Sequence, residues 1–466
     1  MPISPPPRDI FRAYDIRGVA GRDLTVGNIR LIGQAIAESA LARGRQTLLF
    51  GADARLSSPE LAPALREGLM ASGCDLVDLG LVPTPLLYFA AHTTEHDSGV
   101  MLTASHNPAD YNGIKVVLHG RSLTPGQIQA LYERSLTLAS TETGGNPAKA
   151  GHRTRQDVVP AYIRHLKKAI VLQRPLHVVV DCGNAIAGLI APPVLEAIGC
   201  RVTPLFCEVD GRFPNHHPDP TINSNLCALR RTVVEQGADL GIALDGDGDR
   251  MVVVSNSGRI VDTDRLLMLL VRDILPRHPG ANVVFDVKCS SLLREVIEEA
   301  GGQAVLCRSG HSFMKSKMQE TDAVVGAEFS AHVFIRDGWF GHDDGLYVAA
   351  RFMELLARGP EDVDALLDSL PQAISTEELR VEVDEGLKFL LMEKIADQAH
   401  FPEARINRLD GLRAEFLHGW GLIRASNTTP ALLLRFEADD DNALQRIQDS
   451  FRKLLQQAAP GLDVPF

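Results

Sequence analysis

The stretch best suited to chemistry is LDGDGDRMVVV, residues 244–254, in which Asp245, Asp247 and Asp249 alternate with glycines after the apolar run LGIAL. Alternate positions of an extended backbone point to the same side, and glycines allow a tight turn round a small centre. Three crowded carboxylates repel one another unless a cation neutralises them, so the loop predicts a site for a hard divalent metal, Mg2+ first. The simpler alternative is a solvated Asp/Gly turn, which would need neither an arginine nor apolar strands on both sides.

An EF-hand calcium loop fits this stretch poorly. Counted from Asp245, the sixth position is Arg250, where such a loop needs glycine, and the twelfth is Asn256, where it needs glutamate. The pattern therefore favours a compact carboxylate cluster over a calcium-binding loop.

A second candidate is MLTASHNP, residues 101–108, followed by YNGIKV with Lys115. Ser105 stands among small, turn-forming residues, where a serine commonly caps the next helix. Its neighbour His106 does not make a Ser-His-Asp triad by spacing alone. Close to a divalent cation, however, a serine can carry a phosphoryl group, so the two motifs together favour phosphoryl transfer.

Basic side chains stand near hydroxyl and small residues in three further segments, RAYDIRG, CRSGHSFMKSKM and WGLIRASNTTP. Arginine offers a bidentate fork, and hydroxyls and backbone N–H groups can complete a phosphate cradle. Each segment alone is equally typical of a surface loop. The side chains concerned are Arg12, Tyr14, Arg17, Arg308, His311, Lys315, Arg424, Ser426, Asn427, Thr428 and Thr429. A fourth segment, GAEFSAH, places Glu328, Ser330 and His332 at alternate positions, as the end of a half-buried strand also would.

Three similar segments must position these groups. Each begins with an apolar, β-branched run that stops at an aspartate (Asp53, Asp181 or Asp286), and each continues with a helical period. Each then reaches a glycine and a second apolar run; the glycines are Gly73, Gly199 and Gly302. A strand, a helix with a glycine C-cap and another strand make a βαβ unit. We therefore predict three similar α/β domains with mixed sheets, the alternative being one long doubly wound sheet.

The C-terminal part has a different pattern. Alternating strand-like runs such as ELRVEVDEG and ALLLRFEAD precede a helix at residues 442–458, which predicts an α+β domain. Residues 141–151 are small, polar and rich in breakers, as in a linker. The predicted domains are residues 1–150 with the serine loop, 151–255 with the acidic loop, 256–368 with the Glu328 loop and 369–466 with the Arg424 loop.

Composition excludes several classes of protein. The 466 residues carry 47 Lys and Arg against 59 Asp and Glu, a net charge of −12 that argues against a general nucleic-acid binder. Seven scattered cysteines without a C-x-x-C pair indicate buried free thiols in a reducing cytosol. No apolar run approaches the ~20 residues needed to span a bilayer, and the N-terminus is not a signal peptide. We expect a cytoplasmic monomer that binds neither nucleic acid nor membrane.

Together, the T-A-S-H-N-P and D-G-D-G-D-R motifs and their order along the chain resemble the α-D-phosphohexomutase superfamily, most closely its bacterial phosphomannomutase/phosphoglucomutase group. The resemblance covers nearly the whole chain and implies four domains around a central cleft. It also implies a reversible exchange of phosphate between the 1- and 6-positions of mannose or glucose, through a hexose 1,6-bisphosphate. The substrate is then a small phosphosugar.

The resemblance also assigns roles to residues. It implies that Ser105 is carried as phosphoserine and that its phosphate and the three aspartates bind Mg2+. Of the remaining candidate catalytic residues, it implies proton-transfer and phosphate-contacting roles for Arg17, Lys115 and His311, while His106 and Arg250 are candidates beside their motifs. The candidate substrate-binding residues are Tyr14, Lys288, Arg308, Glu328, Ser330, His332, Arg424, Ser426, Asn427 and Thr428, of which Glu328, Ser330 and His332 would read sugar hydroxyls and the last four would hold a phosphate.

Two features refine this interpretation. The sequence F-R-A-Y-D-I-R-G and the presence of Phe329 between Glu328 and Ser330 differ from the phosphoglucosamine mutases. Ala331 stands where the family usually has glycine, and if that position requires a positive φ the alanine has a conformational cost.

Two rival functions stay open at this point. One is a haloacid-dehalogenase-like phosphatase, in which the first aspartate of a D-x-D motif, here Asp245, would be the nucleophile. The other is a sugar-phosphate binding protein without turnover, against which the intact Ser105 and the full acidic loop argue.

Overall fold

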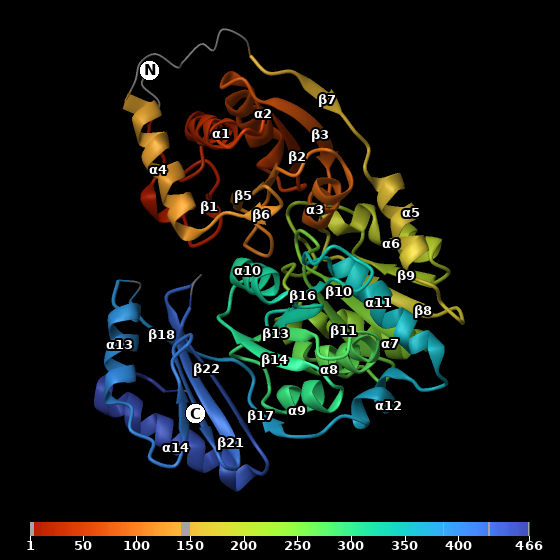
Figure 1. The fold of residues 1–466 in the computed structure, drawn as a ribbon, viewed down its shortest axis with the longest axis vertical. Helices are drawn as coiled ribbons and strands as arrows, with labels where there is room; N and C mark the ends of the chain where they lie inside the picture. The colour runs from red at the N-terminus through yellow and green to blue at the C-terminus, as the bar shows by residue number, and fades with distance from the viewer. Residues whose placement is uncertain (1–3, 141–149, 385, 427–428, 465) are drawn as a thin grey trace. The chain divides into compact units, whose positions relative to one another are not determined.

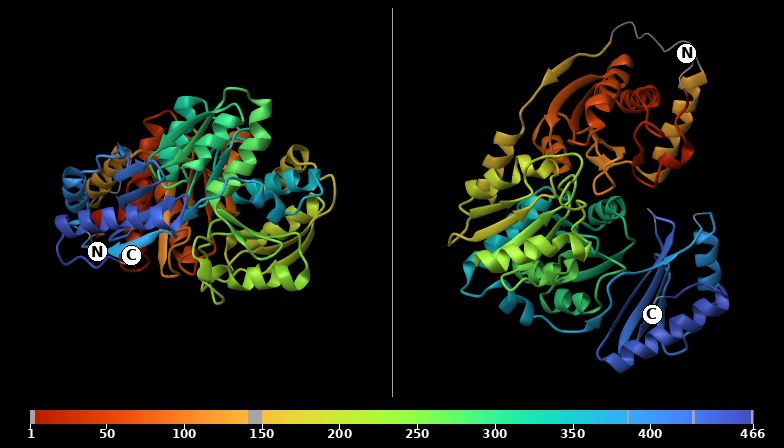
Figure 2. Two further views of the ribbon diagram at one scale, coloured as in Figure 1. Left: turned by 90° about the horizontal axis from the view of Figure 1, so that it is seen from below. Right: turned by 180° about the vertical axis from the view of Figure 1, so that it is seen from behind.

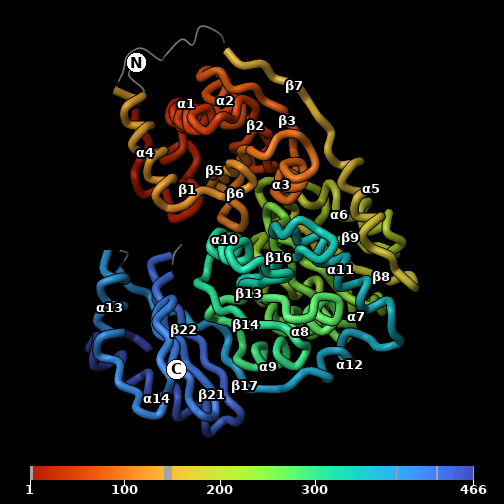
Figure 3. Tube along the Cα trace, viewed as in Figure 1, coloured from red at the N-terminus to blue at the C-terminus, as the bar shows by residue number. Residues whose placement is uncertain are grey.

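The computed structural model describes residues 4–140, 150–384, 386–426, 429–464 and 466. It divides into two compact units, the first made of Met1–Asp262 with Ser330–Leu366 and the second of Thr263–Phe329 with Leu367–Phe466. The predicted linker at residues 141–151 lies almost entirely outside the described residues. Figure 1 shows the elements by label, and Figure 3 traces their order along the chain.

A mixed sheet forms the N-terminal part of the first unit, with strand order β1-β5-β4-β2-β3-β7 and β6 beside β5. β2 runs parallel to β3 and β4, whereas β5 is antiparallel to β4 and β1. Its elements are η1 (Arg8–Ile10), β1 (Ile16–Val19), α1 (Val26–Leu41), β2 (Thr47–Ala52), α2 (Ser58–Ala71), β3 (Asp75–Leu81), α3 (Thr84–Thr93), β4 (Gly99–Leu102), β5 (Tyr111–Leu118), β6 (Arg121–Ser122), α4 (Pro125–Ser140) and β7 (Arg153–Arg155).

Helix α1 shows how local sequence sets these elements. Thr25 and Asn28 form a reciprocal capping box, in which each side chain accepts the other residue's backbone N–H. Ile29, Ile32 and Ile36 then follow at helical spacing and are fully buried in the core shared with α2 and the sheet.

A second mixed sheet, in the order β12-β11-β10-β8-β9, completes the first unit together with the elements around it. β8 is parallel to β9 and β10, and β11 is antiparallel to β10 and β12. The elements are α5 (Val159–Ala169), β8 (His177–Asp181), η2 (Ile186–Leu189), α6 (Ala191–Ala197), β9 (Arg201–Leu205), η3 (Asn223–Leu226), α7 (Cys227–Gln236), β10 (Leu240–Leu244), β11 (Met251–Ser255), β12 (Ile260–Val261), β16 (His332–Ile335), α11 (Gly345–Arg358) and α12 (Val363–Asp368), in which the first unit ends.

In the second unit, β13 is parallel to both β14 and β15. A separate antiparallel sheet, β17-β22-β21-β20-β19 with β18 beside β22, follows, and α13 and α14 pack on it (Figure 2). The elements are α8 (Thr263–Ile274), η4 (Leu275–Arg277), β13 (Asn282–Asp286), α9 (Leu292–Glu299), β14 (Gln303–Cys307), α10 (His311–Thr321), β15 (Val325–Glu328), β17 (Ile374–Ser375), β18 (Leu379–Glu382), α13 (Lys388–Gln398), β19 (Arg405–Asn407), β20 (Leu412–Phe416), β21 (Gly419–Ala425), β22 (Ala431–Ala438) and α14 (Asp441–Ala458).

The predicted fold class is confirmed: the chain is α/β, with three βαβ units and an α+β C-terminal part. Each predicted unit is a parallel strand pair joined through a helical segment, namely β2–β3, β8–β9 and β13–β14. The alternative of one long sheet is wrong, because the strands fall into four sheets. Gly73 and Gly199 take positive φ as predicted. In the third βαβ unit, β13–β14, the left-handed residue is Gly301 and not Gly302.

Two expectations from composition can be compared with the fold. Within the described ranges, no helix combines the length and the apolar character that crossing a membrane requires. The seven cysteines are free, but they are not all buried: Cys207 is half-buried and Cys227 is exposed. The predicted domain boundaries stay predictions.

Candidate active site

The acidic loop lies between two buried strands of the first unit, β10 and β11. Asp245, Asp247 and Asp249 are at most 1% exposed, and ligand oxygens of all three lie within 4.8 Å of one another. Burial and the charges of Asp249 and Asp247 raise the pKa of Asp245 well above its ordinary value. The loop therefore concentrates negative charge where water cannot screen it.

Two carboxylate oxygens of this cluster have no hydrogen-bond donor among the described residues. Oδ1 of Asp247 and Oδ1 of Asp249 are buried and accept no hydrogen bond from any residue that the structure describes. A buried acceptor without a partner is costly, and a bound cation would satisfy it. Because carboxylate oxygens are the donors that hard divalent ions prefer, these residues fit Mg2+.

Ser105 lies at this cluster. Its Oγ donates a hydrogen bond to Oδ2 of Asp245 over 2.7 Å. The serine is 2% exposed and has a φ of +49°, a left-handed conformation that non-glycine residues seldom adopt. The two loops touch, since a Cβ added to Gly246 would lie only 2.0 Å from the Ser105 carbonyl oxygen. The structure thus brings the predicted nucleophile to the predicted metal loop.

Arg55, which sequence reasoning missed, holds the serine loop in place. Its guanidinium donates to the backbone carbonyls of Ser105 (2.5 Å), Asn107 (2.8 Å), Pro108 (2.6 Å) and Tyr111 (3.1 Å). It is 1% exposed and pairs with Asp53, the aspartate that ends the first repeat strand. The spacing D-x-R directly after a buried strand was the available signal.

Lys115, on β5, neutralises part of the negative charge of the acidic loop. Its Nζ donates to Oδ2 of Asp247 over 2.7 Å and to Oδ2 of Asp249 over 2.6 Å. Burial alone would lower the pKa of this lysine, but the two carboxylates outweigh burial and raise it well above its ordinary value. Lys115 is therefore protonated and brings positive charge to the loop.

Arg250 and His332 form a layer beside the cluster. Arg250 donates from its backbone N to Asp245 (3.1 Å) and from Nε to Nε2 of His332 (3.0 Å). The other imidazole nitrogen of His332 faces Asp343 at 3.1 Å and Asp249 at 3.7 Å. Predicted as a sugar-reading residue, His332 lies at the acidic loop, and Asp343 is a further residue that sequence reasoning missed.

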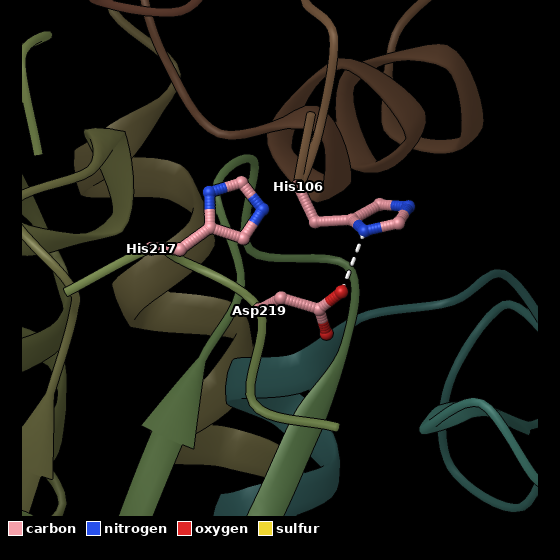
Figure 4. A group of neighbouring side chains, drawn as sticks. All are labelled: His106, His217 and Asp219. Atoms are coloured by element: carbon pink, nitrogen blue, oxygen red, sulfur yellow. Dashed lines mark hydrogen bonds and ion pairs between the residues drawn. The ribbon is translucent and has the colours of Figure 1, made fainter. Parts of the chain in front are cut away.

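His106 pairs with Asp219 across 2.7 Å, and His217 lies beside them (Figure 4). The three could hold a metal by atom type. Burial and then Arg250 lower the pKa of His106 to about 4, and the positive charge of Arg250 also disfavours a cation beside this group. The arrangement instead suits a neutral imidazole that donates from Nδ1 to Asp219. No spacing in the sequence indicated Asp219.

Arg17, on β1, contacts both Asp15 and the side chain of Asn107 in the serine loop. Tyr14 is half-buried and interacts electrostatically with Arg17. The N-terminal basic segment is thereby brought to the serine loop, as predicted for a group that contacts phosphate.

In the second unit, Asp286 organises another group of predicted residues. It accepts hydrogen bonds from Ser309 Oγ (2.6 Å) and the Phe329 backbone N (3.2 Å). The Lys288 Nζ lies 3.8 Å from Asp286 and 3.6 Å from Glu378, and its charge also interacts with Glu328. Lys288 and Glu328 are thus brought together, with Asp286 and Glu378 as residues that had no assigned role.

Arg424, on β21, has a buried N–H group that makes no hydrogen bond to the described residues. Its Nε donates to Oδ2 of Asp410 over 3.0 Å, and the same oxygen accepts from the Ser309 backbone N over 2.9 Å. Its Nη2 is buried and has no hydrogen-bond partner within the described part of the chain. Ser426 is also buried and accepts from Thr429. A buried guanidinium with an unmet N–H suits an anion.

The other predicted residues have less definite environments. His311 is the buried first residue of α10, whereas Arg308 is exposed and lies over the Phe313 ring. Ser330 is half-buried, and Asn427 and Thr428 lie outside the described residues. Ala331 has a φ of +73°, so this position does adopt the left-handed conformation.

Comparison with known proteins gives a consistent result. The chain matches the four models described as phosphoglucomutase/phosphomannomutase: alpha/beta/alpha domain I at residues 8–142, domain II at 160–258, domain III at 262–374 and the C-terminal domain at 378–454. It is 48% identical over 460 residues to a phosphomannomutase/phosphoglucomutase of Pseudomonas aeruginosa, covering 99% of this chain and 98% of that one. It is 46% identical over 453 residues to a phosphoglucomutase of Neisseria gonorrhoeae, covering 96% and 97%.

A solved structure agrees. The fold superposes on a phosphoglucomutase/phosphomannomutase family protein of Burkholderia thailandensis with a TM-score of 0.93 and 44% identity. The match covers 99% of this chain and 100% of the other. Sequence and fold comparisons thus point to the same group of proteins over the same full length.

Proposed function

Because the chain belongs to the phosphoglucomutase/phosphomannomutase family and is an isomerase that interconverts hexose phosphates, we propose that its reaction passes through a phosphorylated Ser105. The observation that carries this proposal is the 2.7 Å hydrogen bond from Ser105 Oγ to Asp245, at a loop with unmet carboxylate oxygens. The phosphoserine passes its phosphoryl group to the free hydroxyl of a hexose monophosphate. Serine keeps its own oxygen, and a hexose 1,6-bisphosphate forms.

The second half of the reaction mirrors the first. The bisphosphate turns over and returns its other phosphate to Ser105, which leaves the isomeric monophosphate. The substrates are the 1- and 6-phosphates of mannose, glucose or both. Phosphoryl transfer requires mainly alignment and neutralisation of charge, and the groups around Ser105 are suited to both tasks.

Asp245, Asp247 and Asp249 would hold Mg2+ together with the serine or its phosphate. When bound, the ion neutralises charge on the transferring phosphoryl group. Lys115 and Arg250 stabilise the outer oxygens of that group, and Arg17 contacts it from β1. Lys115 or His311 exchanges the hydroxyl proton, while His106 stays neutral and is oriented by Asp219.

Residues of the second unit hold the part of the substrate that does not react. Arg424, Ser426, Asn427 and Thr428 bind the distal phosphate, so that remote binding energy positions the reacting hydroxyl. The remaining contacts come from Tyr14, Lys288, Arg308, Glu328, Ser330 and His332. Glu328 and Ser330 grip the sugar hydroxyls that both orientations present. The domains proposed for these tasks are residues 1–150, 151–255, 256–368 and 369–466, in a cytoplasmic monomer.

The test is to follow the phosphoryl group on the intact protein. Incubation with glucose 1,6-bisphosphate should add one phosphoryl group, mapped to Ser105 by peptide mass spectrometry. Glucose 1-phosphate added next should be converted to glucose 6-phosphate, and Ser105 should carry a phosphoryl group again after each turnover. A protein that converts the substrate while Ser105 stays unmodified at every stage would contradict the proposal.

The same experiment separates the phosphatase alternative, which the comparisons do not favour. A haloacid-dehalogenase-like enzyme would carry an aspartyl phosphate on Asp245, which hydroxylamine cleaves, and would release inorganic phosphate. A phosphoserine resists hydroxylamine and is lost in alkali. Label that hydroxylamine removes would therefore move the assignment from Ser105 to Asp245.

A further inference from the structure

Two of the seven cysteines lie in contact, in a part of the first unit that the proposed reaction does not use. The sulfurs of Cys182 and Cys207 are 3.5 Å apart. β8 and β9 are parallel neighbours, paired through Asp181 and Leu205, and each cysteine follows the end of its strand. The Cys182 backbone N donates to the Leu205 carbonyl over 3.2 Å, which continues the pairing into the contact. The sheet itself therefore holds the two thiols together.

The two thiols differ in environment. Cys182 is fully buried, while Cys207 is half-buried. The hydrogen bond between them and burial raise the pKa of Cys182 well above its ordinary value. Cys207 Sγ donates this hydrogen bond to Cys182 Sγ while it is a thiol. When Cys207 loses its proton, Cys182 can donate instead, and this interaction lowers the pKa of Cys207 against the effect of burial. A thiolate is the reactive form of cysteine, so Cys207 is the nucleophile and Cys182 the thiol poised to resolve it.

We propose that Cys182 and Cys207 are a peroxide-reactive pair that closes into a reversible disulfide. The Cys207 thiolate attacks one oxygen of a hydroperoxide, becoming a sulfenic acid and releasing hydroxide or an alkoxide. The Cys182 thiol then attacks the Cys207 sulfur, and water leaves. In sum, two thiols lose two electrons and two protons, and the peroxide is reduced to two molecules of water, or to water and an alcohol. A dithiol restores both thiols by exchange.

Formation of the disulfide would alter the proposed active site, an inference that rests on the proposed function. The sulfurs must approach from 3.5 Å to about 2.05 Å. Asn184 ties the neighbouring segments together: its backbone N donates to the Phe206 carbonyl, and its side chain donates to the Glu208 carbonyl. Residues 207–219 lead from the pair to Asp219, the partner of His106. We expect a shift at Cys207 to be passed along this segment towards Asp219.

The experiment exposes the full-length protein to hydrogen peroxide, unfolds it, blocks the remaining thiols and maps them by peptide mass spectrometry. We expect a mass loss of about 2 Da for the unblocked protein and a cross-linked peptide pair that contains Cys182 and Cys207. Dithiothreitol should reverse both. Activity should fall as the disulfide forms and return on reduction.

Variants separate the pair from general oxidation. Cys182→Ser should trap the sulfenic acid on Cys207, which dimedone labels, and Cys207→Ser should give neither product; neither variant should show loss of activity that dithiothreitol reverses. Cys227→Ser removes an exposed cysteine outside the pair and should behave like the wild type. The proposal is overturned if Cys182 and Cys207 are both still alkylated after peroxide treatment. It is equally overturned if they cross-link while activity stays unchanged.

Discussion

The acidic loop of the first unit and the Arg424 region of the second unit have opposite unmet needs. At the acidic loop, Asp247 and Asp249 each keep a buried oxygen to which no described residue donates a hydrogen bond, although Lys115 already binds their other oxygens. At Arg424 a buried N–H group lacks an acceptor among the described residues, although Asp410 already binds the guanidinium. The first deficit suits a cation and the second an anion. Under the proposed function, the first region does the chemistry and the second holds the remote phosphate, so changes in the first should lower kcat and changes in the second should raise KM.

The largest effect should come from Ser105→Ala. Loss of the covalent nucleophile should lower kcat by at least about 1,000-fold. The fold should persist, because the hydroxyl makes one hydrogen bond. A coupled assay of glucose 6-phosphate formation measures the rate. Ser135→Ala is a matched control, since Ser135 is also buried and its hydroxyl bonds only to the Leu131 carbonyl of α4. Near-normal turnover by Ser105→Ala would exclude Ser105 as the nucleophile.

The second largest effect should come from loss of the metal site. Asp247→Asn, or chelation of the wild type by EDTA, should abolish turnover, and added Mg2+ should rescue only the chelated wild type. Binding at about 100 times Kd should also stabilise the folded wild type by ~2.7 kcal/mol, measured as a rise in Tm. Asp210→Asn is the control, because Asp210 pairs with Arg212 and is not one of the clustered carboxylates. Activity that survives exhaustive chelation would contradict a cation at the acidic loop.

Arg55→Lys should have an intermediate effect on kcat. Lysine keeps the charge beside Asp53 but cannot replace the fork that holds the carbonyls of the serine loop. A small displacement of a reacting group can cost about 100-fold, so we expect kcat to fall by about 10- to 100-fold with KM little changed. Arg22→Lys, at an exposed ion pair, serves as control. A rise in KM alone would place Arg55 among the binding residues instead.

Arg424→Ala tests the proposed phosphate-binding region of the second unit. Loss of a charge-assisted contact costs ~1.5–3 kcal/mol, so kcat/KM should fall by roughly ten- to a hundredfold, mainly through KM. The loss should be similar for the 1-phosphate and the 6-phosphate, because the same cradle holds whichever phosphate is distal. Steady-state assays in both directions decide this. Impairment with only one isomer would rule out a shared distal site.

The smallest effect concerns sugar choice. The 3- and 4-hydroxyls exchange places when the ring turns over, and glucose and mannose share both. Their 1-phosphates should therefore react within about tenfold of each other. Galactose inverts carbon 4 and leaves Glu328 a poorly placed partner, at a cost of ~1.5–3 kcal/mol in kcat/KM. Equal turnover of galactose 1-phosphate would mean that Glu328 does not read that hydroxyl.

How much the sequence could predict depended on distance along the chain. The acidic loop and the Ser105 loop are contiguous motifs beside apolar strands, so residue type and spacing sufficed. Arg55, Asp219 and Asp410 are single charged residues whose contacts at the candidate site, with Ser105, His106 and Arg424, lie 14 to 113 positions away. Charged residues are common on every surface, and only the fold decides which become buried and paired. For the same reason, scattered cysteines gave no indication that Cys182 meets Cys207.

The left-handed backbone at Ala331 has a consequence for the breadth of the conformational ensemble. With a φ of +73°, an alanine is less stable than a glycine by roughly 1 kcal/mol, a factor of about five in an equilibrium constant. The same methyl group removes the mirror-image conformations that glycine samples in the unfolded chain. Ala331 lies two residues past Phe329, where the chain passes from the second unit to the first. At this connection between the two units, the alanine therefore restricts the backbone to fewer conformations than glycine would, at the cost of some strain in the folded state.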